Sequence, residues 1–262
     1  MQSLGEAIRA ALLTGDPRAK VMATRQLVRD WRQGRLSGAL STAMPDRPCW
    51  PDRLKLLPPS QMPRRAKGGS EKTRIALWHS LAHIEFVAID LALDMVGRFG
   101  SEMDEEFIAD FLSVAADEAM HFALIDRKLR QIGIQYGDLP AHDGLWEAAQ
   151  ETCHDVAARL AIVPMVLEAR GLDVTPATLN RVRGQGDLGG AKILERILSD
   201  EIRHVHFGAK HFTAWCLSHD ETPEILWKRL VKKHFRGSLK PPFNDSARSA
   251  AGLSRSFYEA VA

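Results

Sequence analysis

The sequence predicts an all-α protein, in which a four-helix bundle carries additional N-terminal and C-terminal helices and a proline-rich strap. Apolar residues recur with helical spacing over most of the chain, and no segment shows the apolar–polar alternation of a half-buried strand. Glycines and prolines fall between the helical blocks, where such residues end helices. The composition, 45% hydrophobic and 26% charged residues, is typical of a soluble globular protein.

The N-terminal part combines helices with a segment that cannot form a long helix. Residues 4–33 have helical periodicity with an interruption at residues 15–17, where Asp16 suits the N-cap of a second helix. Residues 36–70 then contain six prolines. Because proline lacks the backbone N–H that a helix needs, we expect an ordered, extended strap there.

Four long helical segments are expected to form the bundle. They span, in order, about residues 70–99, 104–132, 145–170 and 190–218. Glycines follow the first three, at Gly100, Gly133 and Gly171, and suit helix ends. A short helix after Pro176 and a further helix from Pro223 precede the C-terminal tail.

We expect a single domain over residues 1–262. It divides into the N-terminal helices and strap (1–70), the bundle (71–218) and a C-terminal helix with its tail (219–262). The apolar runs stay short of the roughly 20 residues that a membrane span needs, and charges interrupt the apolar start of the chain, unlike in a signal peptide. We therefore expect a cytoplasmic protein without membrane contact.

The cysteines and the net charge exclude some classes of protein. Three cysteines lie far apart and form no CxxC motif, so neither a disulfide framework nor a thiolate metal site is indicated. A net charge of +2 does not by itself imply binding to nucleic acid.

Two glutamate–histidine pairs on the predicted bundle helices repeat each other. Glu118 and His121 stand in ADEAMH, and 83 residues later Glu201 and His204 stand in SDEIRH. Residues at positions i and i+3 lie about 60° apart around a helix, so each pair can aim a carboxylate and an imidazole at one point. A further helical glutamate precedes each pair by 33 residues, at Glu85 and Glu168.

The first two bundle helices bring Glu85 and Glu118 to similar depth, since each lies roughly 14 residues, or about 20 Å, from the connecting turn. One glutamate from each of two helices and an ExxH pair from each of the other two is the ligand set of a di-iron or di-manganese centre. Oxygen and nitrogen donors without thiolate favour Fe and permit Mn or Zn. We predict two divalent metal ions, bound by Glu85, Glu118, His121, Glu168, Glu201 and His204.

Aspartates precede both pairs, at Asp117 and Asp200. A carboxylate in that position can bind the other ring nitrogen of a ligand histidine and fix its tautomer, which is the role we predict for both. A third ExxH pair, Glu151 with His154, has no counterpart 83 residues away, and roughly one such pair is expected by chance. We interpret it as a surface or capping feature.

Other residues have two interpretations each. His79 and His83 lie at least 120° around the helix from Glu85, which favours packing contacts over metal binding. Pro164, one turn before Glu168, is either a tolerated kink or a local widening that leaves the metal coordination open. Polar residues in the loop at 136–143 suit turns or line an entrance. The basic runs WKRLVKKHFRGSLK and MPRRAKGG are solvated faces or contacts for an anionic substrate.

These motifs resemble known families. DEAMH and especially DEIRH look like the DExRH helices of di-iron monooxygenases, although Met120 stands where that motif has arginine. The wider pattern is similar to a bacterial ferritin-like family labelled domain of unknown function 455, in the segments HSLAHIEFVAIDLALD, ADEAMHFALI, YGDLPAHDGLW, EARGLDVTP, DEIRHVHFG and PPFNDSARSAAGL. The similarity covers roughly residues 20–258. It implies a ferritin-like di-iron carboxylate fold with the same six metal ligands.

The expected function is that of an oxidoreductase whose di-metal centre, with iron, activates O₂ to oxidise or hydroxylate a substrate. The substrate is an unidentified small molecule or RNA. A hydroxylase would need an external electron donor, since the sequence resembles no flavin, nicotinamide or iron–sulfur site. The alternatives are a ferroxidase-like protein that handles iron or another metal, a hydrolytic di-zinc or di-manganese site, and a non-catalytic bundle with a structural di-metal site. For its assembly, the alternatives include a homodimer.

Overall fold

The computed structural model describes residues 1–62 and 70–259. Among these residues the regular structure is helical, apart from isolated bridges that pair Ser3 with Ser37 and Leu56 with Ala141. The all-α prediction is therefore confirmed. The chain divides into two compact units, Met1–Trp146 and Glu147–Ala262. The expectation that residues 1–262 form one domain stays a prediction.

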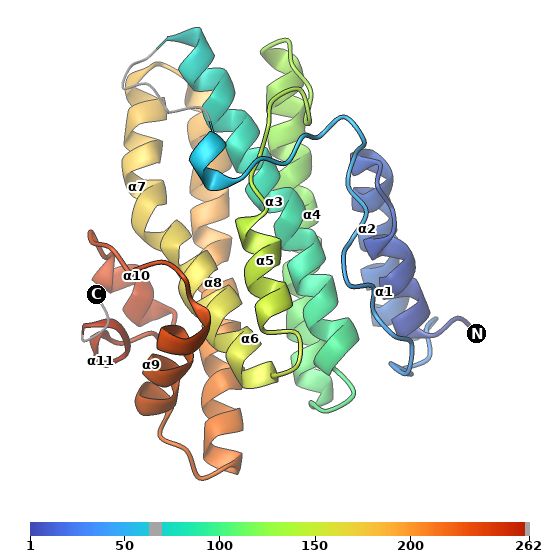
Figure 1. The fold of residues 1–262 in the computed structure, drawn as a ribbon. Coiled ribbons are helices and arrows are strands. Elements are labelled where there is room, and N and C mark those ends of the chain that lie inside the picture. Colours follow the sequence, from blue (N-terminus) through green and yellow to red (C-terminus); the bar gives the residue numbers. More distant parts are fainter. Residues whose placement is uncertain (63–69, 260–262) are drawn as a thin grey trace. The chain divides into compact units, whose positions relative to one another are not determined.

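The first unit contains the N-terminal helices, the strap and the first two long helices (Figure 1). Its elements are α1 (Leu4–Leu12), α2 (Pro17–Arg32), the 3₁₀ turn η1 (Pro59–Gln61), α3 (Glu71–Phe99), α4 (Glu105–Gln131) and the start of α5 (Gly144–Glu151). The predicted interruption before Pro17 is confirmed. The carboxylate of Asp16 accepts a hydrogen bond from the N–H of Ala19 at 2.8 Å and so caps α2.

The ends of α3 and α4 lie within one residue of their predicted positions. The Ser70 hydroxyl accepts from the N–H of Thr73 at the start of α3, and the Asp104 carboxylate accepts from the N–H of Phe107 at 2.8 Å at the start of α4. Gly133 follows α4 with φ +81°, a conformation that glycine adopts without strain. The two helices pack side by side, and the short connection between them makes them antiparallel (Figure 1).

Helix α3 corrects the expectation that every apolar run is too short for a membrane span. An 18-residue window of it has a mean hydropathy of 1.3, so by length and composition alone this helix can cross a membrane. However, 67% of that window is buried inside the protein, as in the core helix of a soluble protein. The helix also buries three carboxylates, at Glu85, Asp90 and Asp94, which hydrocarbon would strongly disfavour.

The strap prediction is confirmed over residues 36–62, whereas residues 63–69, with most of the basic run MPRRAKGG, lie outside the described residues. Apart from η1, this segment forms no helix among the described residues. Its backbone pairs with other segments through Leu4 N–H to Ser37 O (2.9 Å), Gly5 N–H to Ala39 O (3.0 Å), Leu57 N–H to Ala141 O (2.8 Å) and Ala141 N–H to Lys55 O (3.0 Å). These hydrogen bonds satisfy some of the backbone polar groups of the strap without a helix.

The second unit holds the other long helices and the C-terminal tail. Its elements after α5 are α6 (Val156–Ile162), the π-helical segment η2 (Val163–Glu168), α7 (Ala169–Gly184), α8 (Leu188–Ser218), α9 (Pro223–His234), α10 (Asp245–Ala250) and α11 (Arg255–Tyr258). The predicted helices at 190–218 and from Pro223 are confirmed. The tail, expected only to close the chain, contains the short helices α10 and α11.

The prediction of one helix over residues 145–170 is wrong. The chain leaves the helical conformation after Glu151, and α6 begins at Val156. Asp155 is the N-cap of α6, because its carboxylate accepts from the N–H of Ala158 at 3.0 Å.

A buried arginine explains why the chain can break there. The Nε of Arg159 donates to the Thr152 hydroxyl at 3.0 Å, and its Nη2 donates to the carbonyl of Ala149 at 2.6 Å. The guanidinium thus donates hydrogen bonds to a hydroxyl and a carbonyl oxygen at the end of α5. If the helix continued, backbone N–H groups of its next turn would donate to the carbonyls there. Apolar periodicity runs through the break and gives no sign of it.

The predicted stop at Gly171 is also wrong, because α7 continues through Gly171 and Pro176. Gly171 is helical rather than left-handed, so it does not end the helix. Pro176 has no N–H for the carbonyl of Leu172 four residues earlier. The side-chain amide of Asn244 donates to that carbonyl at 3.1 Å, so the helix proceeds without an unsatisfied group.

The turn before Glu168 is widened. Residues Val163–Glu168 form a π-helical segment that contains Pro164, which confirms local widening rather than a simple kink. Pro164 packs against α8 at Gly208, where an added Cβ would lie 2.4 Å from the proline Cβ. The missing side chain at Gly208 therefore makes room for the widened turn.

Replacing Gly208 with alanine is expected to destabilise the protein by about 1–3 kcal/mol, because the new methyl group would overlap the Pro164 ring. Gly171→Ala is the matched control, since a Cβ there meets nothing within 4 Å and alanine favours helix by up to about 1 kcal/mol. Urea unfolding of both variants measures the difference. Similar changes in unfolding free energy would show that the Gly208 contact does not limit packing.

Candidate metal centre

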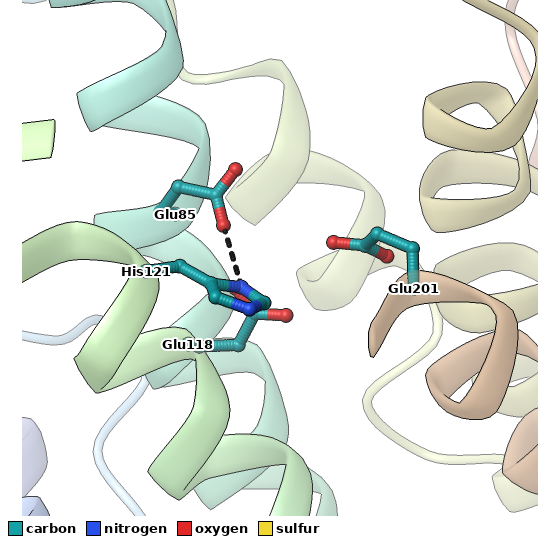
Figure 2. A group of neighbouring side chains, drawn as sticks. All are labelled: Glu85, Glu118, His121 and Glu201. Atoms are coloured by element: carbon teal, nitrogen blue, oxygen red, sulfur yellow. Dashed lines mark ion pairs between the residues drawn. The ribbon is translucent and has the colours of Figure 1, made fainter. Parts of the chain in front are cut away.

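In the first unit, three of the predicted ligands converge. Glu85 projects from α3, and Glu118 and His121 project from α4 (Figure 2). The Nδ1 of His121 lies 3.2 Å from Glu85 Oε2 and 3.5 Å from Glu118 Oε2. One potential ligand atom from each of the three residues lies within 4.8 Å of the others, so this cluster can hold a metal ion.

The helices place these side chains inside the protein. The exposed fractions of Glu85, Glu118 and His121 are 4%, 1% and 0%. Residues Glu118 and His121 share a face of α4 because they are three positions apart. Each neighbouring residue, Phe86 on α3 and Phe122 on α4, is also buried, and their ring centroids lie 5.0 Å apart. The acidic cluster therefore lies on helix segments whose adjacent residues belong to a buried aromatic core.

Burial and mutual repulsion shift the protonation of this cluster. Burial, together with the nearby Glu118 carboxylate, raises the pKa of Glu85 to about 7. Burial alone would lower the pKa of His121, but the carboxylates of Glu118 and Glu85 outweigh it and raise that pKa to about 12. In the absence of metal, protons thus compensate the buried carboxylates. A divalent cation would compensate them more completely.

The contribution of Glu85 to the stability of the metal-free protein is expected to decrease as the pH rises from about 4.5 to about 7. Folded Glu85 retains its proton up to about pH 7, whereas the unfolded chain releases it near the ordinary value of 4.5. The folded state binds more protons in this window, so this contribution is complete below it and decreases by at most about 1.4 kcal/mol per pH unit. His121 adds a loss in the same direction at higher pH.

Urea unfolding in the presence of a chelator, at several pH values across this window, measures that dependence. Glu85→Gln keeps the shape of the side chain without its titration, so the stability of the wild type minus that of this variant isolates the Glu85 contribution. The subtraction removes the opposite contribution of the buried histidines His79 and His83, whose pKa values are lowered to about 4. A difference that stays constant or increases across the window would contradict the assignment.

In the second unit, the corresponding residues lie on packed elements. Glu201 and His204 are buried in α8, with His204 Nδ1 3.8 Å from Glu201 Oε2. Glu168 is the last residue of the π-helical segment, which packs against α8, and it is half-buried. The unit therefore repeats the residue types of the first cluster on a different pair of elements.

The predicted supporting aspartates differ from each other. Asp200 is buried, and its carboxylate accepts from Arg196 Nε at 2.5 Å, with Arg203 Nη2 3.8 Å away. Asp117 is half-buried on α4. Their predicted role of holding the ligand histidines stays a prediction.

The structure confirms the packing interpretation of His83. Its Nδ1 lies 2.8 Å from the Tyr136 hydroxyl and its Nε2 lies 3.0 Å from the carbonyl of His142. Burial lowers the pKa of His83 to about 4, so the ring is neutral. The loop after α4 shows the expected turn contacts, since Asp138 accepts from the N–H of Gln135 at 2.7 Å.

The third ExxH pair is a surface feature, as predicted. Glu151 is exposed and lies 3.3 Å from the guanidinium of Arg236. His154 is exposed, and its ring packs near that of His234. The basic run around α9 also exposes its charged side chains, including Arg229, Lys232 and Lys233.

Sequence analysis missed a buried ion pair in the first unit. Lys20 of α2 pairs with Asp90 of α3, both side chains are fully buried, and Trp50 Nε1 donates to the second Asp90 oxygen at 2.8 Å. Burial outweighs the attraction of Lys20 and raises the pKa of Asp90 to about 6. One signal was available, because Lys20 shares a helical stripe with the apolar Leu27 and Val28.

Comparison with known proteins places the chain in a family. An uncharacterized protein of Haemophilus influenzae is 39% identical over 212 residues, which cover 79% of this chain and 73% of that protein. No solved structure matches the chain. The model of the family described as "Protein of unknown function (DUF455)" matches residues 13–259. The chain therefore belongs to the DUF455 family, as its motifs suggested.

Proposed function

We propose that the protein is a di-iron carboxylate oxidoreductase of the ferritin-like type, which uses O₂ to oxidise or hydroxylate a substrate. In this proposal α3, α4, the segment from α6 to α7, and α8 are the four helices of the bundle. Two divalent ions would be held by Glu85, Glu118, His121, Glu168, Glu201 and His204. Iron suits these donors best, and manganese or zinc can replace it.

The observation that carries the proposal is the convergence of Glu85, Glu118 and His121 inside the first unit. Carboxylates rarely cluster in a protein interior unless a cation compensates them, because burial and repulsion both disfavour their charge. Oxygen and imidazole nitrogen are the donors of non-haem iron sites. The chemistry of this cluster therefore fits iron.

The 83-residue repeat extends the cluster to a paired centre. It relates Glu85 to Glu168, Glu118 to Glu201 and His121 to His204, and the second set lies on packed elements of its own unit. Four carboxylates carry a formal charge of −4, which two divalent ions neutralise. The π-helical segment that ends at Glu168 supports an accessible centre, because such segments occur frequently at functional sites.

When bound, the iron ions would supply the reduction of O₂. The residues of the chain would supply the environment for that reaction. Glu118 and His121 fix two donors on one rigid helix face, and Glu85 provides a third donor from α3. The three donor side chains are themselves buried, so bulk water has little access to them, which limits side reactions. A hydroxylation would also take two electrons from an external donor, and the substrate would be a small molecule or RNA.

Metal content and oxygen consumption together test this proposal. Protein purified without chelators is expected to contain close to two Fe or Mn per chain by elemental mass spectrometry. After anaerobic loading with Fe(II), it should consume O₂ when mixed with air-saturated buffer. Chains that bind two ions but consume no O₂ would indicate a structural site, and chains that bind none after loading would refute the proposal.

Size measurement separates the oxidoreductase from a storage protein. A storage cage needs many subunits to enclose a mineral, so a monomer or a homodimer in solution would favour the oxidoreductase. A large shell that accumulates many Fe ions per chain would favour iron handling instead.

A further inference from the structure

A cavity of about 510 Å³ lies in the first unit, between α3 and the loop that joins α4 to α5. Its walls are mainly apolar and include Ile75, Ala76, Ile84, Ile134, Leu139 and Leu145. Few polar side chains reach it, among them His79 and His83. A cavity of this volume, apolar with a few polar groups, has the character of a small-molecule site.

His79 presents a hydrogen-bond donor to this cavity. Its Nε2 accepts hydrogen bonds from the N–H of Gly137 at 2.9 Å and of Leu139 at 3.4 Å, so the neutral ring carries its proton on Nδ1. No acceptor for Nδ1 exists among the described residues. The side chain is 1% exposed and lines the cavity.

Nδ1 is the nitrogen of His79 that is available to a ligand. A ligand oxygen that accepts from it inside an apolar cavity would form a hydrogen bond that favours binding. The neighbouring His83 offers no such nitrogen, because both of its ring nitrogens already have partners in Tyr136 and His142. Of the two histidines in this wall, His83 is held by the protein at both ring nitrogens, whereas His79 is held at one.

We propose that the cavity binds an uncharged, apolar molecule with one oxygen acceptor, such as a ketone, an ester or an ether, whose oxygen accepts a hydrogen bond from His79 Nδ1. The apolar walls would surround the rest of the molecule.

The surroundings of His79 favour a neutral ligand over a carboxylate. Burial lowers the pKa of His79 to about 4, which shows that this wall strongly disfavours charge. A buried carboxylate would meet the same penalty without a cation to offset it. Lys72 lines the cavity as well, but it is exposed, and water solvates its ammonium group.

The cavity is separate from the metal ligand on the same helix. At 100° per residue, Glu85 lies about 160° around α3 from His83 and about 120° from His79. Its carboxylate therefore points away from the wall that these histidines form. The inference goes beyond the proposed function and needs no bound metal.

Benzophenone and diphenylmethane form a matched pair of probes, since they have similar size and only benzophenone has a carbonyl oxygen. Calorimetric titration of the metal-free, full-length protein is expected to give about tenfold tighter binding of benzophenone, which corresponds to one net hydrogen bond. Irradiation of the benzophenone complex should cross-link peptides from α3 or from residues 132–145. Mass spectrometry identifies these peptides.

Substitutions localise the binding. Ala76→Trp should fill the cavity and abolish binding of both probes, whereas Ala10→Trp makes the same change at an exposed position and should have no effect. His79→Phe should remove the preference for benzophenone while diphenylmethane still binds. If that variant fails to fold, the tryptophan pair and the cross-linked peptides still decide the question.

The results that would overturn the proposal concern affinity, the filled cavity and the cross-links. They are equal affinity of the wild type for both probes, binding that Ala76→Trp leaves unchanged, and cross-links that map outside the cavity. Tighter binding of diphenylacetate than of benzophenone would also overturn it, because it would show that the site selects an anion.

Discussion

Replacing Glu118 with alanine is expected to reduce the metal content by at least one ion per chain and to remove most of the stabilisation that metal provides. Glu118 is buried beside His121 and would contribute a carboxylate to the centre. A metal that binds only the folded state, at a free concentration 100 times its dissociation constant, stabilises that state by about 2.7 kcal/mol. Elemental mass spectrometry and thermal unfolding, with and without Fe(II), measure both effects.

Glu151→Ala is the matched control for this experiment. Glu151 also stands in an ExxH pair, but it is exposed and pairs with Arg236. We expect this variant to keep the wild-type metal content and the wild-type increase in melting temperature. Equal losses in both variants would mean that the effect of Glu118→Ala is not specific to the proposed site.

The comparison rests on the stability increase that metal produces, since the substitution also affects the metal-free protein. Without metal, the Glu118 carboxylate helps to raise the pKa of the buried His121 and so pairs with its ring. Removing one partner of a buried pair destabilises a protein, so metal-free Glu118→Ala should be less stable than the metal-free wild type. A glutamate that binds metal is recognised by the loss of the metal-induced increase in melting temperature, which the loss of a purely structural glutamate would leave intact.

Glu201→Ala tests whether the second unit contributes to the same centre. If the repeat forms one paired site, this variant should also lose at least one ion. Normal metal content in Glu201→Ala, together with loss in Glu118→Ala, would restrict metal binding to the cluster of Glu85, Glu118 and His121. That outcome would remove the second half of the proposed ligand set.

The sequence predicted the long helices well where local signals mark their ends. Asp16, Ser70 and Asp104 each accept a hydrogen bond from a backbone N–H at the start of a helix. Aspartate and serine are preferred at this position, so the residue type alone predicts the helix start. The predicted helix over 145–170 failed because its ends depend on distant partners. The break before Asp155 depends on buried Arg159, and the passage through Pro176 depends on Asn244, far along the chain.

The candidate site was easier to predict than the residues around it. Glu85, Glu118 and His121 have a fixed spacing that repeats 83 residues later, so their convergence in the first unit was expected. The Lys20–Asp90 pair has no such pattern, because its members lie 70 residues apart on helices whose packing the sequence does not reveal. The free donor of His79 depends on two backbone N–H groups of a loop, which leave no sign in residue identity.

Replacing Lys20 with methionine is expected to destabilise the protein by about 3–5 kcal/mol at neutral pH, because it leaves the Asp90 carboxylate buried without its counter-charge. Trp50 still donates one hydrogen bond to Asp90 but carries no charge. Arg130→Met is the control, since Arg130 pairs with Asp126 at the surface and such pairs contribute at most about 1 kcal/mol. Urea unfolding compares the variants.

The pH dependence gives this prediction a second readout. The pKa of Asp90 in the folded protein is about 6, above its ordinary value of 3.8, so folded Asp90 is increasingly protonated as the pH falls below 6. Protonation removes the uncompensated charge, and the loss of Lys20 should therefore cost less at pH 5 than at pH 8. The double variant Lys20→Met, Asp90→Leu should recover much of the stability, because an apolar pair of similar volume can replace a buried ion pair. If the two single changes simply add, Lys20 and Asp90 do not stabilise each other, and the pair is only a close contact.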